Sequence, residues 1–405
     1  MCQSNTVKQI VLLVIMCLCL ASCSASRESN TINANDSSSI KSSEESSPLD
    51  EQAQYNVRVW DKMCEMDGVY YFVMGTSIHY CDQVSGQYGV LCGKPECEHK
   101  GSSCNGYVGP ENCLAAYDGK IYTIASSLAG TKLYRVNPDG TNREEVRELD
   151  SLDGGNGRVY IHRGYVYMSK DTQQVVNGQT STTFHMYQYE LGSNEEPVVV
   201  MEETHEYIEI PFYHFVNDEI YMILPYVDNN QRIISIRKID LSNCDVEELW
   251  VGDVGGSTTN FLIDKDVMYI ANELEKGERE VRILQYDITK NTMEYGSKLR
   301  GAKGEYHITS EYIVFAADIS NTYMIMDHSG KIFDEGSFFK VEGDPTSTVE
   351  CVYIGEDDGA LFFQWLNSYT KNSRFCSDMY IVKWTPDSVD VLVEYNYVAD
   401  GVVYS

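Results

Sequence analysis

Positive charge is scarce in this chain of 405 residues. It contains 31 Lys and Arg against 61 Asp and Glu, for a formal net charge of −30 at pH 7. Nucleic acids and anionic lipid or polymer surfaces bind proteins through positive patches. We therefore expect no nucleic-acid partner. The acid excess indicates either a well-solvated surface or divalent-cation binding, although no Asp-x-Asp-x-Asp-Gly loop with a following Glu is present.

Catalytic signatures are also missing. The sequence has no Gly-x-Ser-x-Gly elbow, no His-Glu-x-x-His, no P-loop and no Gly-x-Gly-x-x-Gly opening a helix. The glycine-rich stretch at residues 154–157 precedes no helical pattern, which favours a loop. Adjacent acids such as Asp357 and Asp358 would serve a glycosidase only if two were held at a defined separation. We interpret these acids as turn residues.

Long helical periodicity is absent beyond the N-terminus, and a strand unit recurs instead. In its clearest copy, Asp118-Gly119 forms a tight turn and Lys120-Ile121-Tyr122 begins an alternating strand. An aromatic anchor follows each such turn with a period of roughly 40–50 residues, which is typical of β-propeller blades. The anchors are Tyr71, Tyr122, Tyr167, Tyr221, Tyr269, Phe315, Phe362 and Tyr404.

These eight anchors predict an all-β fold, a β-propeller whose stacked blades cover one another's faces. The last copy, residues 400–405, ends before its outer strands. It could complete the first blade, giving seven blades, or pair with residues 57–60 and form an eighth. We predict seven, because joining both chain ends in one sheet also locks the ring.

The N-terminus predicts export. Lys8 precedes an apolar run at residues 10–20, which has the length of a signal-peptide core and is short for a membrane span. Residues 1–22 are therefore expected to be a signal peptide, and their loss would make the net charge one unit more negative. Residues 23–54 are rich in Ser, Asn and Glu and predict a disordered tether. Residues 55–405 would form the propeller domain.

One segment of the domain concentrates cysteine. Thirteen Cys are present, and nine remain after residues 1–23. Cys92, Cys97, His99 and Cys104 lie within thirteen residues, in the spacing C-x4-C-x-H-x4-C. A Cys₃His set suits a tetrahedral structural zinc ion, while disulfides are natural in an exported protein, with Cys64 or Cys113 supplying a further partner. Metal ligands, disulfides and free thiols stay open here. With either a metal ion or disulfides, we expect the segment to stabilise the first connection between blades.

Two resemblances follow from these motifs. Leu20-Ala21-Ser22-Cys23 resembles the bacterial lipobox, which implies diacylglyceryl modification of Cys23 and anchoring to the lipid bilayer at the extracytoplasmic face of the cell membrane. Together with the Ser-rich tether, the Cys-rich segment and the Asp-Gly-Lys-Ile-Tyr blades, the chain resembles propeller lipoproteins of Gram-positive anaerobes, whose repeat is similar to TolB-like propellers. That group has no established chemistry, so the resemblance transfers no catalytic residue.

The expected function is therefore non-enzymatic: a monomeric surface lipoprotein that binds a glycan, a peptide or an envelope protein. Its 30 Tyr exceed what the anchors need and would suit such contacts. Two alternatives stay open, a polysaccharide hydrolase or lyase with its site in the propeller channel, and a sensor or accessory subunit of a membrane complex. His205 and His214, with Glu203, Glu206 and Glu209 nearby, form a further candidate metal site.

Overall fold

The computed structural model describes residues 62–398, except 109–113, 128–129, 150–158, 177–178, 194, 210, 275–279, 301–304, 310, 318–321, 340–347 and 372–373. All of these residues belong to the second of two units, Ser46–Ser405. The predicted signal peptide, Cys23 and the tether lie outside the described residues, as do Cys113, Tyr404 and the glycines at 154–157.

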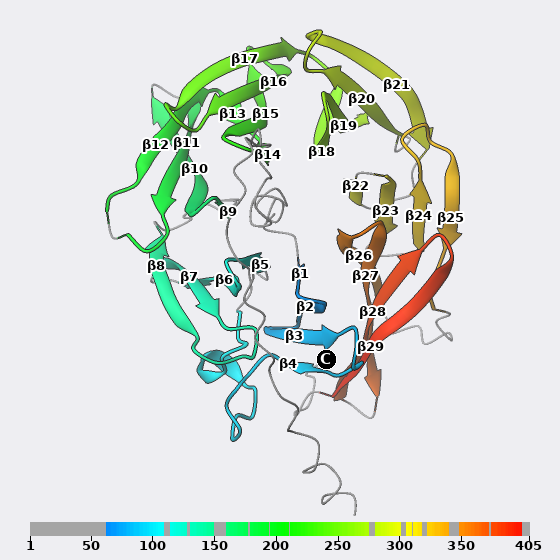
Figure 1. Ribbon diagram of the computed structural model, residues 1–405. Coiled ribbons are helices and arrows are strands. Elements are labelled where there is room, and N and C mark those ends of the chain that lie inside the picture. The colour runs from blue at the N-terminus through cyan, green and yellow to red at the C-terminus, as the bar shows by residue number, and fades with distance from the viewer. Residues whose placement is uncertain are drawn as a thin grey trace, which may run out of the picture. The chain divides into compact units, whose positions relative to one another are not determined.

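The described residues form seven antiparallel sheets that follow one another around a ring (Figure 1). The first three sheets contain β1 (Met63–Met66), β2 (Val69–Met74), β3 (Ser77–Asp82) and β4 (Tyr88–Val90); β5 (Leu114–Tyr117), β6 (Lys120–Ser127), β7 (Gly130–Val136) and β8 (Glu144–Leu149); and β9 (Val159–His162), β10 (Tyr165–Val176), β11 (Gln179–Glu190) and β12 (Val198–His205). A 3-10 turn, η1 (Gly101–Ser103), lies between the first two sheets.

The remaining four sheets repeat this order. They contain β13 (Tyr207–Ile208), β14 (Phe212–Val216), β15 (Glu219–Asp228), β16 (Gln231–Asp240) and β17 (Asp245–Gly252); β18 (Gly256–Asp264), β19 (Val267–Leu274), β20 (Glu280–Asp287) and β21 (Thr292–Arg300); β22 (Glu305–Ile308), β23 (Ile313–Ala317), β24 (Thr322–Met326) and β25 (Ile332–Gly336); and β26 (Thr348–Asp357), β27 (Ala360–Lys371), β28 (Arg374–Thr385) and β29 (Ser388–Val398). Each sheet is one blade, so the predicted seven-bladed β-propeller is confirmed.

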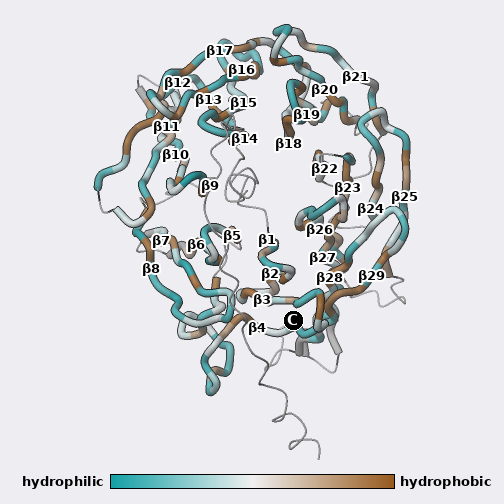
Figure 2. Tube along the Cα trace, in the orientation of Figure 1, coloured by the Kyte–Doolittle hydropathy of each residue, from teal (hydrophilic) through white to brown (hydrophobic). Residues whose placement is uncertain are grey.

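The turn chemistry explains why the blades begin where they do. Asp118 and Gly119 join β5 to β6 with φ values of 46° and 66°, and Tyr117 pairs directly with Lys120. Two successive positive φ angles define the hairpin turn whose twist matches that of the flanking strands. Hydrophobic and hydrophilic residues are mixed along the strands (Figure 2). The second strands of the first and fourth blades, β2 and β15, are buried almost throughout, so their alternate side chains face the blades on both sides.

The predicted aromatic anchors lie in the second strand of each blade. Six of the seven described anchors stand two places after the first residue beyond the turn, as Tyr122 does after Lys120. In the sixth blade the turn follows Thr309, whose N–H donates to the carbonyl of Tyr312. The equivalent position is therefore Val314, and the predicted Phe315 is one residue out of register. Val314 faces the seventh blade, whereas Phe315 packs against the fifth.

The core consists of clusters between adjacent blades. Seven such clusters are present among the described residues, one at every junction of the ring. The cluster that closes the ring joins Tyr70 and Phe72 of the first blade to Phe362 and Ile381 of the seventh. Removing this apolar surface from water is worth about 25 cal/mol per Å², so packing between the blades is a major stabilising contribution.

Polar contacts reinforce the closing junction. The hydroxyl of Tyr70 donates to Oδ2 of Asp357 at 3.0 Å, and Nζ of Lys383 donates to the same hydroxyl at 3.3 Å. The first sheet already holds four strands, all from the N-terminal side of the ring. Closure within the described residues thus occurs by side-chain packing. The predicted pairing of residues 400–405 with the first blade lies outside them.

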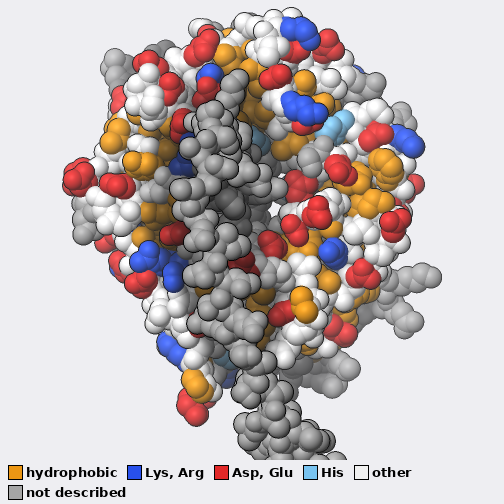
Figure 3. Space-filling model, in the orientation of Figure 1, with side chains coloured by type: hydrophobic (Ala, Val, Ile, Leu, Met, Phe, Trp, Pro, Cys, Tyr) orange, Lys and Arg blue, Asp and Glu red, His pale blue; other side chains and the backbone are white. Residues whose placement is uncertain are grey.

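The surface carries acidic side chains around the visible face, with fewer Lys and Arg among them (Figure 3). Within the part of the chain that the structure describes, no helix has the length and hydrophobicity needed to cross a membrane.

Candidate metal centre between the first two blades

The cysteine-rich segment leaves the first blade directly after its outermost strand, β4. Leu91, the residue after β4, is buried in the core, and its N–H donates to the carbonyl of Ile78 at 2.9 Å. The chain then forms the loop Cys92–Cys104, which includes η1 near its end. Beyond the loop the chain returns to β3, where Tyr107 forms a β-bridge with Ser77. Both ends of the loop are therefore held against the same strand.

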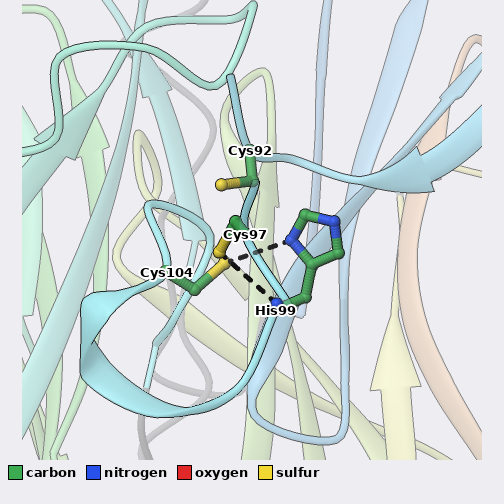
Figure 4. Close-up of side chains that lie close together, drawn as sticks. All are labelled: Cys92, Cys97, His99 and Cys104. Atoms are coloured by element: carbon green, nitrogen blue, oxygen red, sulfur yellow. Dashed lines mark hydrogen bonds between the residues drawn. The ribbon is translucent and has the colours of Figure 1, made fainter. Parts of the chain in front are cut away.

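All four predicted ligands converge in this loop (Figure 4). Their ligand atoms lie within 4.8 Å of one another. Cys104 Sγ and His99 Nδ1 stand 3.6 Å apart, which matches the roughly 3.6 Å between sulfur and nitrogen ligands of tetrahedral zinc. His99 reaches this position with a φ of 57°, and its N–H donates to Cys97 Sγ at 3.4 Å.

The surroundings of the Cys92 and Cys104 sulfurs shift their pKa values in opposite directions. Burial opposes ionisation of Cys92, but N–H groups of Lys94 and Asn105 and the thiols of Cys97 and Cys104 hold its pKa below the ordinary value. Burial raises the pKa of Cys104 to about 12, although the N–H of Gly106 opposes that shift. Backbone N–H groups thus point at both sulfurs, as outer-shell donors do in metal centres.

The chemistry of the set is that of a structural site. Cys92, Cys97 and Cys104 are thiols in the structure, which carries no disulfide among them. Three sulfurs and one imidazole fill a tetrahedral shell, whereas catalytic zinc keeps a position for water or substrate. The predicted residues are therefore brought together in a closed arrangement that can hold a metal ion. The identity of the ion stays a prediction.

The second predicted metal site is not formed. His205 lies between two carboxylates, with Nε2 2.7 Å from Glu203 Oε1 and Nδ1 2.7 Å from Asp228 Oδ2, and stacks on Tyr226. His214 instead lies in β14 with its ring 6.1 Å from that of Phe261. The two histidines belong to different junctions between blades. The carboxylate of Glu203 is already paired with Arg237.

The acidic pairs and tryptophans have structural contacts. Asp357 accepts a hydrogen bond from Tyr70, and Asp358 occupies a turn with a φ of 45°. Trp365 and Trp384 are buried between the sixth and seventh blades, where Trp384 Nε1 donates to Asp334 at 2.7 Å. Both tryptophans therefore serve the packing between blades.

One carboxyl group has a raised pKa. Burial raises the pKa of Asp171, in β10, to about 6, and His185 opposes the shift. The folded state therefore binds this proton more tightly than the unfolded state, so this group lowers stability as pH rises from about 4 to about 6. We expect Asp171→Asn to remove that part of the pH dependence. Urea unfolding at pH 4, 5, 6 and 7 measures it, and an unchanged slope in the variant would contradict the assignment.

No protein-family model matches the sequence, and no curated protein sequence is similar to it. Solved structures with a similar fold include a prolyl endopeptidase (TM-score 0.52, 12% identity, 87% of this chain and 52% of that chain). They also include Pyrococcus horikoshii acylaminoacyl peptidase (TM-score 0.49, 11% identity, 86% of this chain and 54% of that chain). The chain spans about half the length of these two peptidases. At such low identity the likeness extends to the propeller fold alone.

Proposed function

We propose that this chain is a non-enzymatic propeller of the cell surface, anchored through acylated Cys23, whose Cys₃His loop holds a structural zinc ion. The observation that carries the zinc assignment is the convergence of four protein ligand atoms within 4.8 Å. Four protein ligands complete a tetrahedral zinc shell and leave no position for a substrate. A stabilising role follows more directly from this arrangement than a catalytic one.

The location of the centre supports the same role. The loop follows the outermost strand of the first blade and precedes the innermost strand of the second. It therefore spans the junction between two blades. The propeller then acts as a rigid scaffold that presents its loops to a glycan, a peptide or an envelope protein. Rigid scaffolds carrying exposed loops are a common basis for binding.

Two measurements on the purified protein test the zinc assignment. Native mass spectrometry is expected to show one bound zinc ion, lost on treatment with a strong chelator. Denaturing mass spectrometry is expected to show Cys92, Cys97 and Cys104 as thiols. A mass lower by two hydrogens per cysteine pair, without zinc, would replace the metal centre by disulfides.

The anchoring and the binding role are tested separately. Wild-type protein is expected in the membrane fraction, and a Cys23→Ala variant in the soluble fraction. A thermal-shift screen of the soluble variant against glycans and peptides is expected to identify a ligand that raises the unfolding temperature. That ligand is expected to be recovered chemically intact after incubation with the protein. Cleavage products would establish an enzyme instead. A screen without any hit would contradict free glycan or peptide binding and direct the search to a protein partner by crosslinking on cells.

A further inference from the structure

We infer that Asn105 and the turn at residues 137–141 of the second blade position the zinc ligands, so that zinc binding and the docking of this turn onto the loop are coupled. The inference rests on the proposed zinc centre and adds to it a coupling between two blades. It is carried by two hydrogen bonds to the Gly140 carbonyl, one from the backbone N–H of Gly93 and one from the side chain of Asn105.

A single carbonyl oxygen of the second blade joins both ends of the ligand loop. The N–H of Gly93 donates to the carbonyl of Gly140 at 2.8 Å, and Nδ2 of Asn105 donates to the same oxygen at 2.7 Å. Gly93 directly follows Cys92, the first ligand, and Asn105 directly follows Cys104, the last. The Gly140 carbonyl therefore sets the separation of the two ends of the ligand set.

The contact leaves no room for a side chain on Gly140. A Cβ on Gly140 would lie 2.6 Å from the backbone nitrogen of Cys92 and 2.7 Å from its Cα. Because both atoms belong to the backbone, the turn and the ligand loop cannot both keep their positions with an added methyl group. The fit at Gly93 is also tight, since a Cβ there would lie 2.6 Å from the side-chain Cγ2 of Thr141 and 3.2 Å from the carbonyl oxygen of Asp139.

The turn itself is rigid. Gly140 N–H donates to the carbonyl of Asn137 at 2.8 Å, and Asn137 N–H donates to the carbonyl of Thr141 at 3.0 Å. Oδ1 of Asp139 accepts from both the N–H and the hydroxyl of Thr141. A displacement at Gly140 is therefore transmitted to the ligand loop instead of being absorbed within the turn.

The loop has a second attachment to the same blade. Nη1 of Arg143, just beyond the turn, donates to the carbonyl of Ser102 in η1 at 3.4 Å, and Lys94 ties the two halves of the loop together by donating to the carbonyl of Ser103 at 2.7 Å. Coupling between two binding events is reciprocal, so the factor by which docking of the turn strengthens zinc binding equals the factor by which zinc strengthens docking. A substitution that prevents docking therefore removes that factor from the zinc affinity.

Two glycines provide a matched test. Gly140 and Gly119 both occupy turns of the second blade with positive φ, 76° and 66°, but a Cβ on Gly119 would meet nothing within 4 Å. Alanine imposes similar backbone strain at both positions, and only Gly140→Ala disturbs the ligand loop. In full-length protein, competition with a chromophoric chelator is expected to show zinc affinity reduced roughly 10- to 100-fold in Gly140→Ala, the range for outer-shell substitutions. Gly119→Ala is expected to match wild type.

Asn105→Ala is the milder second variant, in case Gly140→Ala does not fold. It removes one hydrogen bond to Gly140 and is expected to weaken zinc binding about 10-fold, the lower end of the range for outer-shell substitutions. Circular dichroism at matched temperature checks that each variant is folded before its affinity is compared.

The reverse direction of the coupling is measured by hydrogen exchange. Removing zinc from wild type is expected to accelerate exchange at the amides of Asn137 and Gly140. The sixth blade offers a control, because Asp327 and Gly330 form the same two hydrogen bonds, Asp327 N–H to Lys331 and Gly330 N–H to Asp327, away from the metal loop. Their amides are expected to exchange at unchanged rates.

The outcomes separate the coupling from the zinc centre. Wild-type zinc affinity in Gly140→Ala and Asn105→Ala, or unchanged exchange in the turn, would overturn the coupling and leave the zinc centre in place. Failure of wild type to bind zinc would overturn both. Weakened zinc binding in Gly140→Ala or Asn105→Ala, with Gly119→Ala at wild-type affinity, would support the coupling.

Discussion

Replacing Cys104 with serine is expected to abolish zinc binding and to lower the free energy of unfolding by about 4 kcal/mol when zinc is present at 1,000 times its dissociation constant. Cys104 is the most deeply buried of the four ligands, with 1% of its surface exposed. A hydroxyl is a poor replacement for a thiolate ligand of zinc. The stabilisation that zinc gives to the native state alone would therefore be lost.

Zinc stoichiometry and thermal unfolding, each with and without chelator, measure this effect. Cys244→Ser is the control, because Cys244 is a thiol in the fourth blade outside the metal loop. Wild type and Cys244→Ser should both lose stability on chelation, whereas Cys104→Ser should be insensitive to it. A variant that still responded to chelator as wild type does would rule out Cys104 as a ligand.

Phe362→Ala is expected to destabilise the closed ring by about 3–5 kcal/mol, the usual cost of removing a buried aromatic side chain from a core. Phe362 is fully buried in the cluster that joins the seventh blade to the first. Its ring centroid lies 4.7 Å from that of Tyr70. The substitution leaves a cavity at the junction where the two ends of the propeller meet.

Phe315→Ala provides the comparison, since Phe315 is buried at the junction of the fifth and sixth blades. Both variants should lower the midpoint of denaturant unfolding. Only Phe362→Ala should selectively accelerate hydrogen exchange in β1, β2 and β27, because no covalent connection crosses the closing junction within the described residues. Equal exchange patterns in the two variants would argue against a special role for that junction.

The repeat was readable because its cause is local. A two-residue turn needs residues that tolerate positive φ, and the following strand needs alternating apolar side chains. Both requirements produce a sequence pattern with fixed spacing, in which a turn pair such as Asp118-Gly119 is followed three residues later by an aromatic residue such as Tyr122. In the sixth blade the equivalent position holds Val314, which is not aromatic, and the aromatic Phe315 stands next to it, so the search for an aromatic anchor selected Phe315.

The ligand set was readable for a similar reason, since Cys92, Cys97, His99 and Cys104 are close in sequence. The spacing could not distinguish metal ligands from disulfides, because either needs the same close approach. His205 and His214 show the opposite case. They are also close in sequence, but β12 and β14 belong to different blades, so their side chains enter different junctions.

By itself, the sequence determined the all-β repeat and the residues of the ligand loop, because turn preferences and strand alternation act over a few neighbouring residues. Only the tertiary structure decided how the ring closes and what holds the loop. Tyr70 meets Asp357, and Asn105 meets Gly140, across chain separations that no local pattern encodes. Those contacts depend on the stacking of whole blades, in which each sheet is positioned by the apolar face of the next.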